Sequence, residues 1–98
     1  MKYTLIVTRA AELDITHTFL DYEEKRDGLG HDFLLCVEDA LARIEKHPLH
    51  YQTVYKHLRR VLVRRFPYSV FYFEDDNKLI VTAVFHARSD PEAWDDRT

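Results

Sequence analysis

The stretch YSVFYFEDDNKLIVTAVFHA, residues 68–87, decides the fold. Two runs of β-branched and aromatic residues, 68–73 and 79–87, flank the polar group EDDNK. Residues of the first kind favour strands, and a short run rich in Asp and Asn favours a tight turn. The stretch therefore predicts a β-hairpin.

Two more segments on the N-terminal side of this hairpin have the composition of strands. The run LRRVLVRRF, residues 58–66, is strand-like, with charges near both ends and an apolar middle, and Pro67 follows it. The segment YTLIVT, residues 3–8, is short and rich in β-branched residues. Both segments are predicted to be strands.

A helix is predicted between these strands, over about residues 11–25. Ile15, Phe19 and Tyr22 lie at i, i+4 and i+7, which places them on one stripe of that helix. The sequence RDGLG then ends it, since Gly28 suits a left-handed C-terminal cap and Gly30 helps the turn.

A second helix follows this turn and ends before Pro48, because the residue before a proline is disfavoured in the helical region. Its apolar face consists of Phe33, Val37, Ala40, Leu41 and Ile44. The short connection makes the two helices an antiparallel hairpin. Cys36 lies beside the apolar face, where we expect a small buried hydrophobe.

The element order is thus β-α-α-β-β-β in a single domain that spans residues 1–98. An antiparallel sheet with the helical hairpin on one face is the simplest way to bury both apolar surfaces. The fold class is therefore predicted to be α+β.

Several classes of site and location are disfavoured. One cysteine allows neither an intramolecular disulfide nor a cysteine-based zinc site. His47 and His50 have Pro48 between them and no third ligand, so no metal is expected. No phosphate-binding glycine motif is present, and no cofactor is expected. No apolar run is long enough to span a membrane, and we expect a cytoplasmic protein.

Charge is distributed unevenly around a net value of −3. Residues 9–47 hold ten acids and five bases, and residues 74–98 hold seven acids and three bases. Residues 48–73 hold no acid and five bases: Lys56, Arg59, Arg60, Arg64 and Arg65. The chain is therefore acidic with one basic segment.

The four arginines of this segment are expected in one strand, where neighbours alternate between faces. Arg60 and Arg64 then share one face, and Arg59 and Arg65 share the other. They either solubilise the strand ends and pair with the acidic helices, or form a cationic surface for phosphate or an acidic partner protein. Both interpretations remain open at this point.

His86 and Arg88 are predicted to lie at one rim, where the last strand ends. A histidine there could act as acid or base on a ribose 2′-hydroxyl, with arginines stabilising the developing charge. A structural role is the alternative. Asp90-Pro91 resembles a turn or a helix N-cap, and Trp94 is expected to cover the sheet edge.

The chain resembles the RelE/ParE superfamily of toxins from bacterial type II toxin–antitoxin modules. The resemblance covers nearly the whole chain and is carried by Gly-Leu-Gly (28–30), Arg-Arg-Phe-Pro-Tyr (64–68) and Phe-His-Ala-Arg-x-Asp-Pro (85–91). It implies an α-hairpin on a small antiparallel sheet. It also implies one of two targets, the ribosome with mRNA, which RelE-like nucleases cut, or DNA gyrase, which ParE inhibits.

The nuclease pattern is only partly matched. Ser69 stands where RelE-like nucleases have an arginine, and Trp94 stands where they have a tyrosine. Their paired lysines correspond to Arg60 and Leu62, so one positive charge is kept, and Arg88 matches a further arginine.

Relatives that resemble YoeB and YafQ instead use a histidine close to the position of His86. The candidate nuclease residues are therefore His86, Arg65, Arg60 and Arg88. A net charge of −3 is unusual for a protein that binds RNA phosphates. The gyrase branch is therefore favoured over the nuclease.

The resemblance also implies a cognate antitoxin, whose disordered segment folds as it wraps the toxin. We expect it to cover the groove between the helical hairpin and the sheet, together with the basic strand. The candidate partner-binding residues are Lys56, Arg59, Arg60, Arg64, Arg65, Arg88 and Trp94. A homologue that only binds its antitoxin, without toxicity, is a third possibility.

Overall fold

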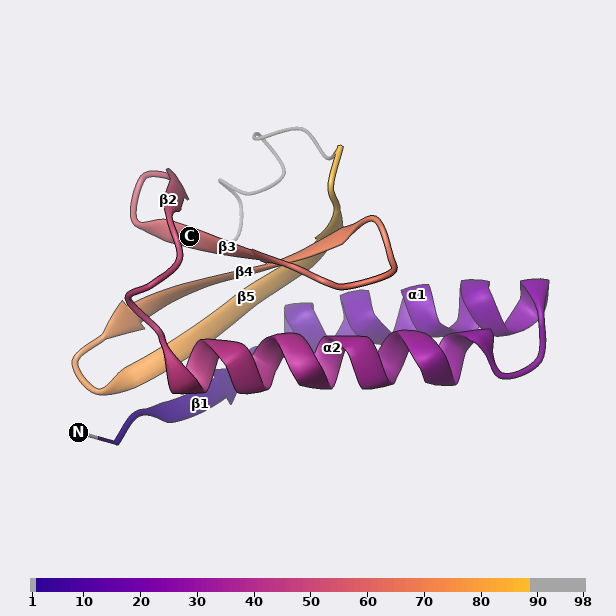
Figure 1. Ribbon diagram of the computed structural model, residues 1–98, viewed down its shortest axis with the longest axis horizontal. Coiled ribbons are helices and arrows are strands. Elements are labelled where there is room, and N and C mark those ends of the chain that lie inside the picture. Colours follow the sequence, from indigo (N-terminus) through magenta and orange to yellow (C-terminus); the bar gives the residue numbers. More distant parts are fainter. Residues whose placement is uncertain (1, 89–98) are drawn as a thin grey trace.

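Figure 1 shows the computed structural model, which describes residues 2–88. The elements are β1 (Thr4–Val7), α1 (Arg9–Lys25), α2 (Leu29–Lys46), β2 (Thr53–Tyr55), β3 (Leu58–Leu62), β4 (Tyr68–Asp75) and β5 (Lys78–His86). The two helices form a long antiparallel hairpin on one side of the twisted sheet. The predicted α+β class and the helical hairpin are confirmed.

Residues near each helix start explain where the helices begin. Thr8 caps α1, because its Oγ1 accepts a hydrogen bond from the backbone N–H of Ala11 at 3.2 Å. Gly28 has the predicted left-handed conformation, with a φ of 88°, but it directly precedes α2, and the C-terminal cap of α1 is Arg26. Gly28 thus serves the connection between the helices.

Gly30 has a different role from the one predicted. It lies inside the first turn of α2, where a Cβ atom would stand 2.5 Å from the carbonyl oxygen of Phe19. Its backbone N–H donates to Glu23 Oε1 at 2.9 Å. Gly30 therefore permits close packing of the two helices, and Glu23 satisfies a free N–H at the start of α2.

The sheet has five strands in the order β1-β5-β4-β3-β2. The hairpin predicted from residues 68–87 is β4 and β5, joined by a tight turn at Asp76 and Asn77. Two features differ from the predicted antiparallel sheet. The edge strand β2 was not predicted, and β1 pairs in parallel with β5, with Ile6 opposite Ile80. Parallel pairing needs a long crossover, which the helical hairpin supplies.

The main core lies between the helices and the sheet. Its buried members include Phe33, Val37 and Ile44 from α2 and Tyr72 and Val81 from the sheet. Cys36 is half-buried and packs against this core, so the small buried hydrophobe is confirmed in part. On the opposite face of the sheet lies a smaller cluster, called here the far-face cluster, whose members within residues 2–88 all come from strands.

An irregularity between β4 and β5 is tied to α1. The register shifts between Phe71 and Tyr72, which pair with Ala83 and Val81. Just beyond it, the backbone N–H of Val84 donates to Asp14 Oδ2 of α1 at 3.0 Å. The bulge therefore turns a backbone donor toward the helix. Within residues 2–88, no helix has the length and apolar character needed to cross a membrane.

Candidate functional site

The basic segment divides into a strand and a turn. Arg59 and Arg60 lie in β3, but β3 ends at Leu62 and Arg64 and Arg65 lie in the turn before β4. The predicted alternation of all four arginines along one strand is therefore wrong. Arg65 has a φ of 71°, a left-handed conformation that no strand contains.

Arg59 faces the helix side of the sheet and binds other parts of the chain. Its Nη1 donates to the carbonyl oxygen of Tyr51 at 2.6 Å, and its Nη2 donates to Glu74 Oε1 at 3.2 Å. Its side chain is 21% exposed. Arg59 therefore fixes the segment after α2 to the sheet.

A second anchor for that segment is the buried phenol of Tyr72. Its hydroxyl donates to the carbonyl oxygen of Pro48 at 2.6 Å. Burial raises the pKa of Tyr72 to about 12, and the charges nearby change that pKa less. The hydroxyl therefore keeps its proton, and this bond, across the physiological pH range.

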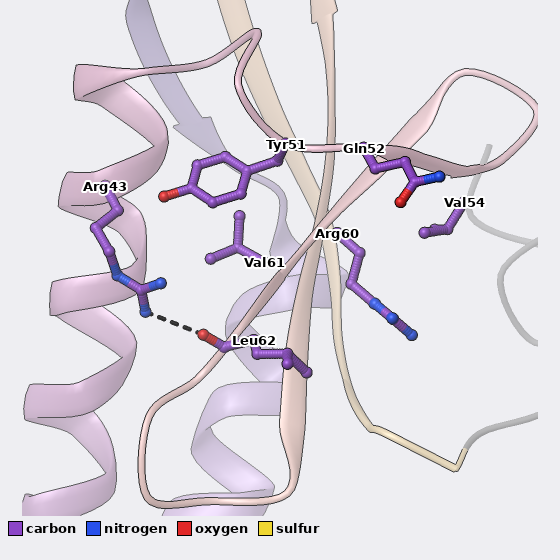
Figure 2. A pocket seen from close by; sticks show the side chains of 7 residues that line it. All are labelled: Arg43, Tyr51, Gln52, Val54, Arg60, Val61 and Leu62. Carbon is purple, nitrogen blue, oxygen red and sulfur yellow. Dashed lines mark hydrogen bonds between the residues drawn. The ribbon is translucent and has the colours of Figure 1, made fainter.

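A pocket of about 300 Å³ lies beside β3, between α2 and the segment that leads into β2 (Figure 2). It is lined by Arg43, Tyr51, Gln52, Val54, Arg60, Val61 and Leu62. Sequence reasoning did not identify Arg43, Tyr51 or Gln52 as site residues. They come from α2 and from the segment that leads into β2, and nothing in their local pattern connects them.

The two arginines of the pocket differ in their bonding. Arg43 donates from Nη2 to the carbonyl oxygen of Leu62 and from Nε to Asp39, both at 3.0 Å. The side chain of Arg60 points to the other side of β3 (Figure 2), and its guanidinium forms no hydrogen bond or ion pair within residues 2–88. The guanidinium of Arg60 is therefore available for an acidic or phosphate group.

Arg64 and Arg65 make only long ion pairs with α2. The Nε of Arg64 lies 3.9 Å from Asp39 Oδ2, and the Nη2 of Arg65 lies 3.8 Å from Asp32 Oδ2. Both arginines are about two-thirds exposed, at 68% and 64%. Such exposed pairs contribute little to stability, so both arginines can rearrange toward a partner.

His86 ends β5 with its ring against Tyr68, at a centroid distance of 5.4 Å. Its Nδ1 accepts a hydrogen bond from the backbone N–H of Arg88 at 3.1 Å. In a neutral imidazole with Nδ1 as acceptor, Nε2 carries the proton. The exposed nitrogen is therefore a donor in this arrangement, whereas a general base needs a free lone pair.

The four candidate nuclease residues are not brought together. Arg60 pairs with Phe71 on the far face of the sheet, whereas His86 pairs with Tyr68 and packs on its ring. Their strands flank β4, so two strand spacings separate them across the sheet, and their partners on β4 are three residues apart along it. Together these two offsets place the backbones about 14 Å apart. Arg65, Arg88 and His86 do share one end of the sheet, because Arg65 packs over Phe66 beside the same aromatic group.

His47 and His50 were considered as metal ligands in the sequence. The rings of His47 and His50 lie 6.3 Å apart. Within the part of the chain that the structure describes, no group of three or more potential ligands could hold a metal ion. Trp94 lies outside the described residues.

Comparison with known proteins then identifies the family. Residues 5–91 match the model of the ParE toxin of the type II toxin–antitoxin system parDE. The chain belongs to the ParE toxin family. The predicted membership of the RelE/ParE superfamily is thereby confirmed.

Relatives and solved structures agree with this assignment. Toxin ParE2 of Mycobacterium tuberculosis, from two strains, is 29% identical over 94 residues, which covers 95% of this chain and 90% of that protein. A chain of the chromosomal ParDE system from P. aeruginosa is similar with a TM-score of 0.67 and 14% identity, over 87% of this chain and 96% of the other. A chain of the M. tuberculosis RelBE2 toxin–antitoxin complex is similar with a TM-score of 0.58 and 21% identity. The match covers 88% of this chain and 99% of the other. At such identities, the structural matches support the fold.

Proposed function

We propose that this ParE-family toxin inhibits DNA gyrase and that a cognate antitoxin neutralises it. The observation that carries the choice of target is the separation of the nuclease candidates. The backbone of Arg60 lies about 14 Å from that of His86, and the two side chains lie on opposite faces of the sheet. A nuclease needs an acid, a base and charge stabilisation around one scissile phosphate.

The surroundings of His86 and Ser69 and the net charge of the chain also favour gyrase over the nuclease. The proton-accepting nitrogen of His86 is already bonded to the backbone of Arg88. Ser69, which stands where RelE-like nucleases have an arginine, is fully buried and faces away from the helices, opposite Phe85. The formal charge of −3 also disfavours tight binding to ribosomal RNA. A toxin that binds a protein–DNA complex needs none of these chemical groups.

The antitoxin proposal rests on the unpaired part of β3. Strand β2 pairs with β3 only at Arg59 and Leu58, so the edge beyond Arg60 has no strand beside it within residues 2–88. Leu62 is 56% exposed at that edge, next to the pocket and to Arg60. An extended acidic segment of an antitoxin could add there and bind the arginines from Arg59 to Arg65.

A nuclease remains the second candidate, because Arg65, His86 and Arg88 do share one end of the sheet. The experiment that separates the two targets is pulse labelling in cells that express the toxin without its antitoxin. An early fall in thymidine incorporation supports gyrase inhibition, and purified toxin should then block supercoiling. An early fall in methionine incorporation supports the nuclease. If growth continues, a role restricted to antitoxin binding replaces both.

Variants make the same test residue by residue. Arg65→Ala and His86→Ala should keep most of the toxicity if binding energy is spread over a surface. A nuclease would lose activity with either change. His17→Ala is the matched control for His86→Ala, because His17 is an exposed histidine on α1. Both targets are cytoplasmic, so the proposal places the toxin in the cytoplasm.

A further inference from the structure

The edge of β3 that points away from β4 carries the backbone groups of Arg60 and Leu62. The backbone N–H of Val63 donates to the carbonyl oxygen of Tyr68 at the start of β4, at 2.9 Å. Successive residues of a strand direct their backbone groups to opposite sides, so those of Arg60 and Leu62 point away from β4. The N–H of Arg60 does so, because it donates to the carbonyl oxygen of Gln52 at 3.4 Å. Leu62 is thus the residue through which a further strand would pair with β3.

A side chain already binds the carbonyl group at this edge. Nη2 of Arg43, from α2, donates to the carbonyl oxygen of Leu62 at 3.0 Å (Figure 2). A strand added beside Leu62, parallel or antiparallel, would place a backbone N–H about 2.9 Å from the same oxygen. The guanidinium of Arg43 and an added strand therefore compete for one position.

Arg43 is held at this edge by a second bond on its own helix. Its Nε donates to Asp39 Oδ2 at 3.0 Å, and the two residues are neighbours on one helix face. Asp39 Oδ2 also lies 3.9 Å from Nε of Arg64. The pocket of about 300 Å³ adjoins Arg43 and Leu62, so Nη2 has room to turn away while Nε keeps its bond to Asp39. The contact with Leu62 is therefore the one that can open.

The edge has the accessibility that makes such a cover useful. Leu62 is 56% exposed, and no strand lies beside it on this side within residues 2–88. Open strand edges pair readily with other chains, and proteins protect them with charged side chains. A guanidinium on the carbonyl oxygen of Leu62 puts a charge where a second chain would pair. A segment can bind there only if its other contacts offset the loss of that bond.

The side chains on the two sides of β3 define which segment has such contacts. Residues paired across two strands place their side chains on the same face. A residue paired with Leu62 therefore lies on the side of Arg60, whose guanidinium has no partner within residues 2–88. The next residues of the added strand lie on the helix side, at the pocket wall formed by Tyr51 and Val61. Acids at the first positions and apolar residues at the second fit the two sides.

We propose that Arg43 guards the β3 edge, and that a strand of alternating acidic and apolar residues binds there by displacing its guanidinium from Leu62. The inference rests on the proposed binding of an antitoxin at this edge, and it states the chemistry of the segment that binds. Every added strand has to break the bond between Arg43 and Leu62. Only a strand with acids beside Arg60 and apolar residues in the pocket replaces it, so the guard selects the partner and opposes association of two toxin copies.

The test uses the full-length toxin and a fluorescein-labelled peptide, Glu-Val-Glu-Val-Glu, which as a strand presents acids on one face and valines on the other. Fluorescence anisotropy at high salt, where charge attraction is screened, gives its Kd. Arg43→Ala should bind the peptide about fivefold more tightly than the unmodified toxin, the value of one net hydrogen bond. Arg43→Lys should also bind more tightly, because an ammonium keeps the charge but lacks the fork that joins Asp39 to Leu62. It also serves if Arg43→Ala fails to fold, which far-UV circular dichroism reveals.

Matched controls make the result specific. Arg26→Ala removes the same charge at the tip of the helical hairpin and should leave the Kd unchanged. A peptide methylated on alternate backbone nitrogens has no N–H to offer Leu62 and should not bind. The peptide Lys-Val-Lys-Val-Lys should bind more weakly than the acidic one, because it places ammonium groups beside Arg60.

Three outcomes would overturn the guard. One is weaker or equal peptide binding by Arg43→Ala and Arg43→Lys, which makes Arg43 an attracting charge or a bystander. Another is equal affinity for the methylated peptide, which excludes strand pairing. The third is self-association of Arg43→Ala in sedimentation with unchanged peptide affinity, which assigns the edge to a second copy of the chain.

The proposed function is tested apart from the guard, because these titrations require neither toxicity nor gyrase. The same variants are then titrated with the purified antitoxin. Tighter peptide binding by Arg43→Ala, together with an antitoxin affinity that does not respond to the change, would keep the guard and place the antitoxin elsewhere on the toxin. A response of both ligands supports the guard and the antitoxin site together.

Discussion

Arg59 and Arg60 are neighbours in β3, yet their side chains lie on opposite faces of the sheet and have different surroundings. Arg59 donates to Tyr51 and Glu74 and is 21% exposed. Arg60 borders a pocket and binds no other residue within 2–88 through its guanidinium. Identical charges in consecutive positions thus serve the fold in one case and are available for recognition in the other.

The largest effect is expected for Arg59→Ala. The change removes two hydrogen bonds from a charged donor and leaves the carboxylate of Glu74 without its partner. Loss of such bonds should lower the free energy of unfolding by about 2–3 kcal/mol. Urea denaturation of the purified toxin measures it.

Arg59→Lys is the matched control, since it keeps the charge but not the planar fork that reaches two acceptors. It should restore only part of the stability. An unchanged denaturation midpoint in Arg59→Ala would mean that this arginine does not fix the segment after α2.

Tyr72→Phe tests the second anchor of the same segment. It deletes the hydrogen bond to Pro48 and should lower stability at neutral pH by about 1–2 kcal/mol. Alkaline pH adds a specific signature. The phenol is protonated in both states below pH 10, but above it the unfolded chain loses the proton while the folded chain holds it up to about pH 12.

Rising pH through this window therefore favours unfolding, because the folded state binds the extra proton. The stability of the unmodified toxin should fall between about pH 10 and 12 more steeply than that of Tyr72→Phe. Parallel slopes in denaturation curves recorded across this window would show that Tyr72 titrates normally in the folded state.

The contrast within β3 also shows how far the sequence could predict the structure. The β-branched and aromatic composition of their runs located β4 and β5, and the strand-like run 58–66 located β3. Apolar residues continue past the end of β3 at Val63 and Phe66, which are buried and half-buried, although they lie in the turn before β4. Apolar spacing could not reveal the turn, and Arg64 and Arg65 were therefore placed in a strand.

The pocket escaped prediction for a related reason. Arg43 reaches the carbonyl oxygen of Leu62 from a helix, across 19 positions of the chain. In the sequence, Arg43 is one more charge on the polar face of that helix. Likewise β2 is only three residues long and carries little pattern, and its place beside β3 depends on the anchors at Arg59 and Tyr72. Such contacts are tertiary and leave no local periodicity.

Arg60→Ala is the counterpart of Arg59→Ala. Its stability should stay within about 0.5 kcal/mol of the unmodified toxin, as for other surface changes. If the antitoxin binds at the β3 edge, its Kd should rise about tenfold, which equals 1.4 kcal/mol. Arg26→Ala at the tip of the helical hairpin is the control with the same charge change. Calorimetric titration measures both, and equal affinities for the two variants would exclude Arg60 from the interface.

Arg65→Gly should give the smallest change, and one of opposite sign. Arg65 has a φ of 71°, which glycine adopts without steric cost, and its ion pair with Asp32 is long and exposed. Relief of the backbone strain should raise the free energy of unfolding by about 0.5–1 kcal/mol. Arg65→Ala removes the same guanidinium but keeps the strain, so it should leave stability nearly unchanged. If Arg65→Gly is instead the less stable of the two, the guanidinium contributes more to the fold than its distances indicate. Arg65 would then resemble Arg59 and not Arg60.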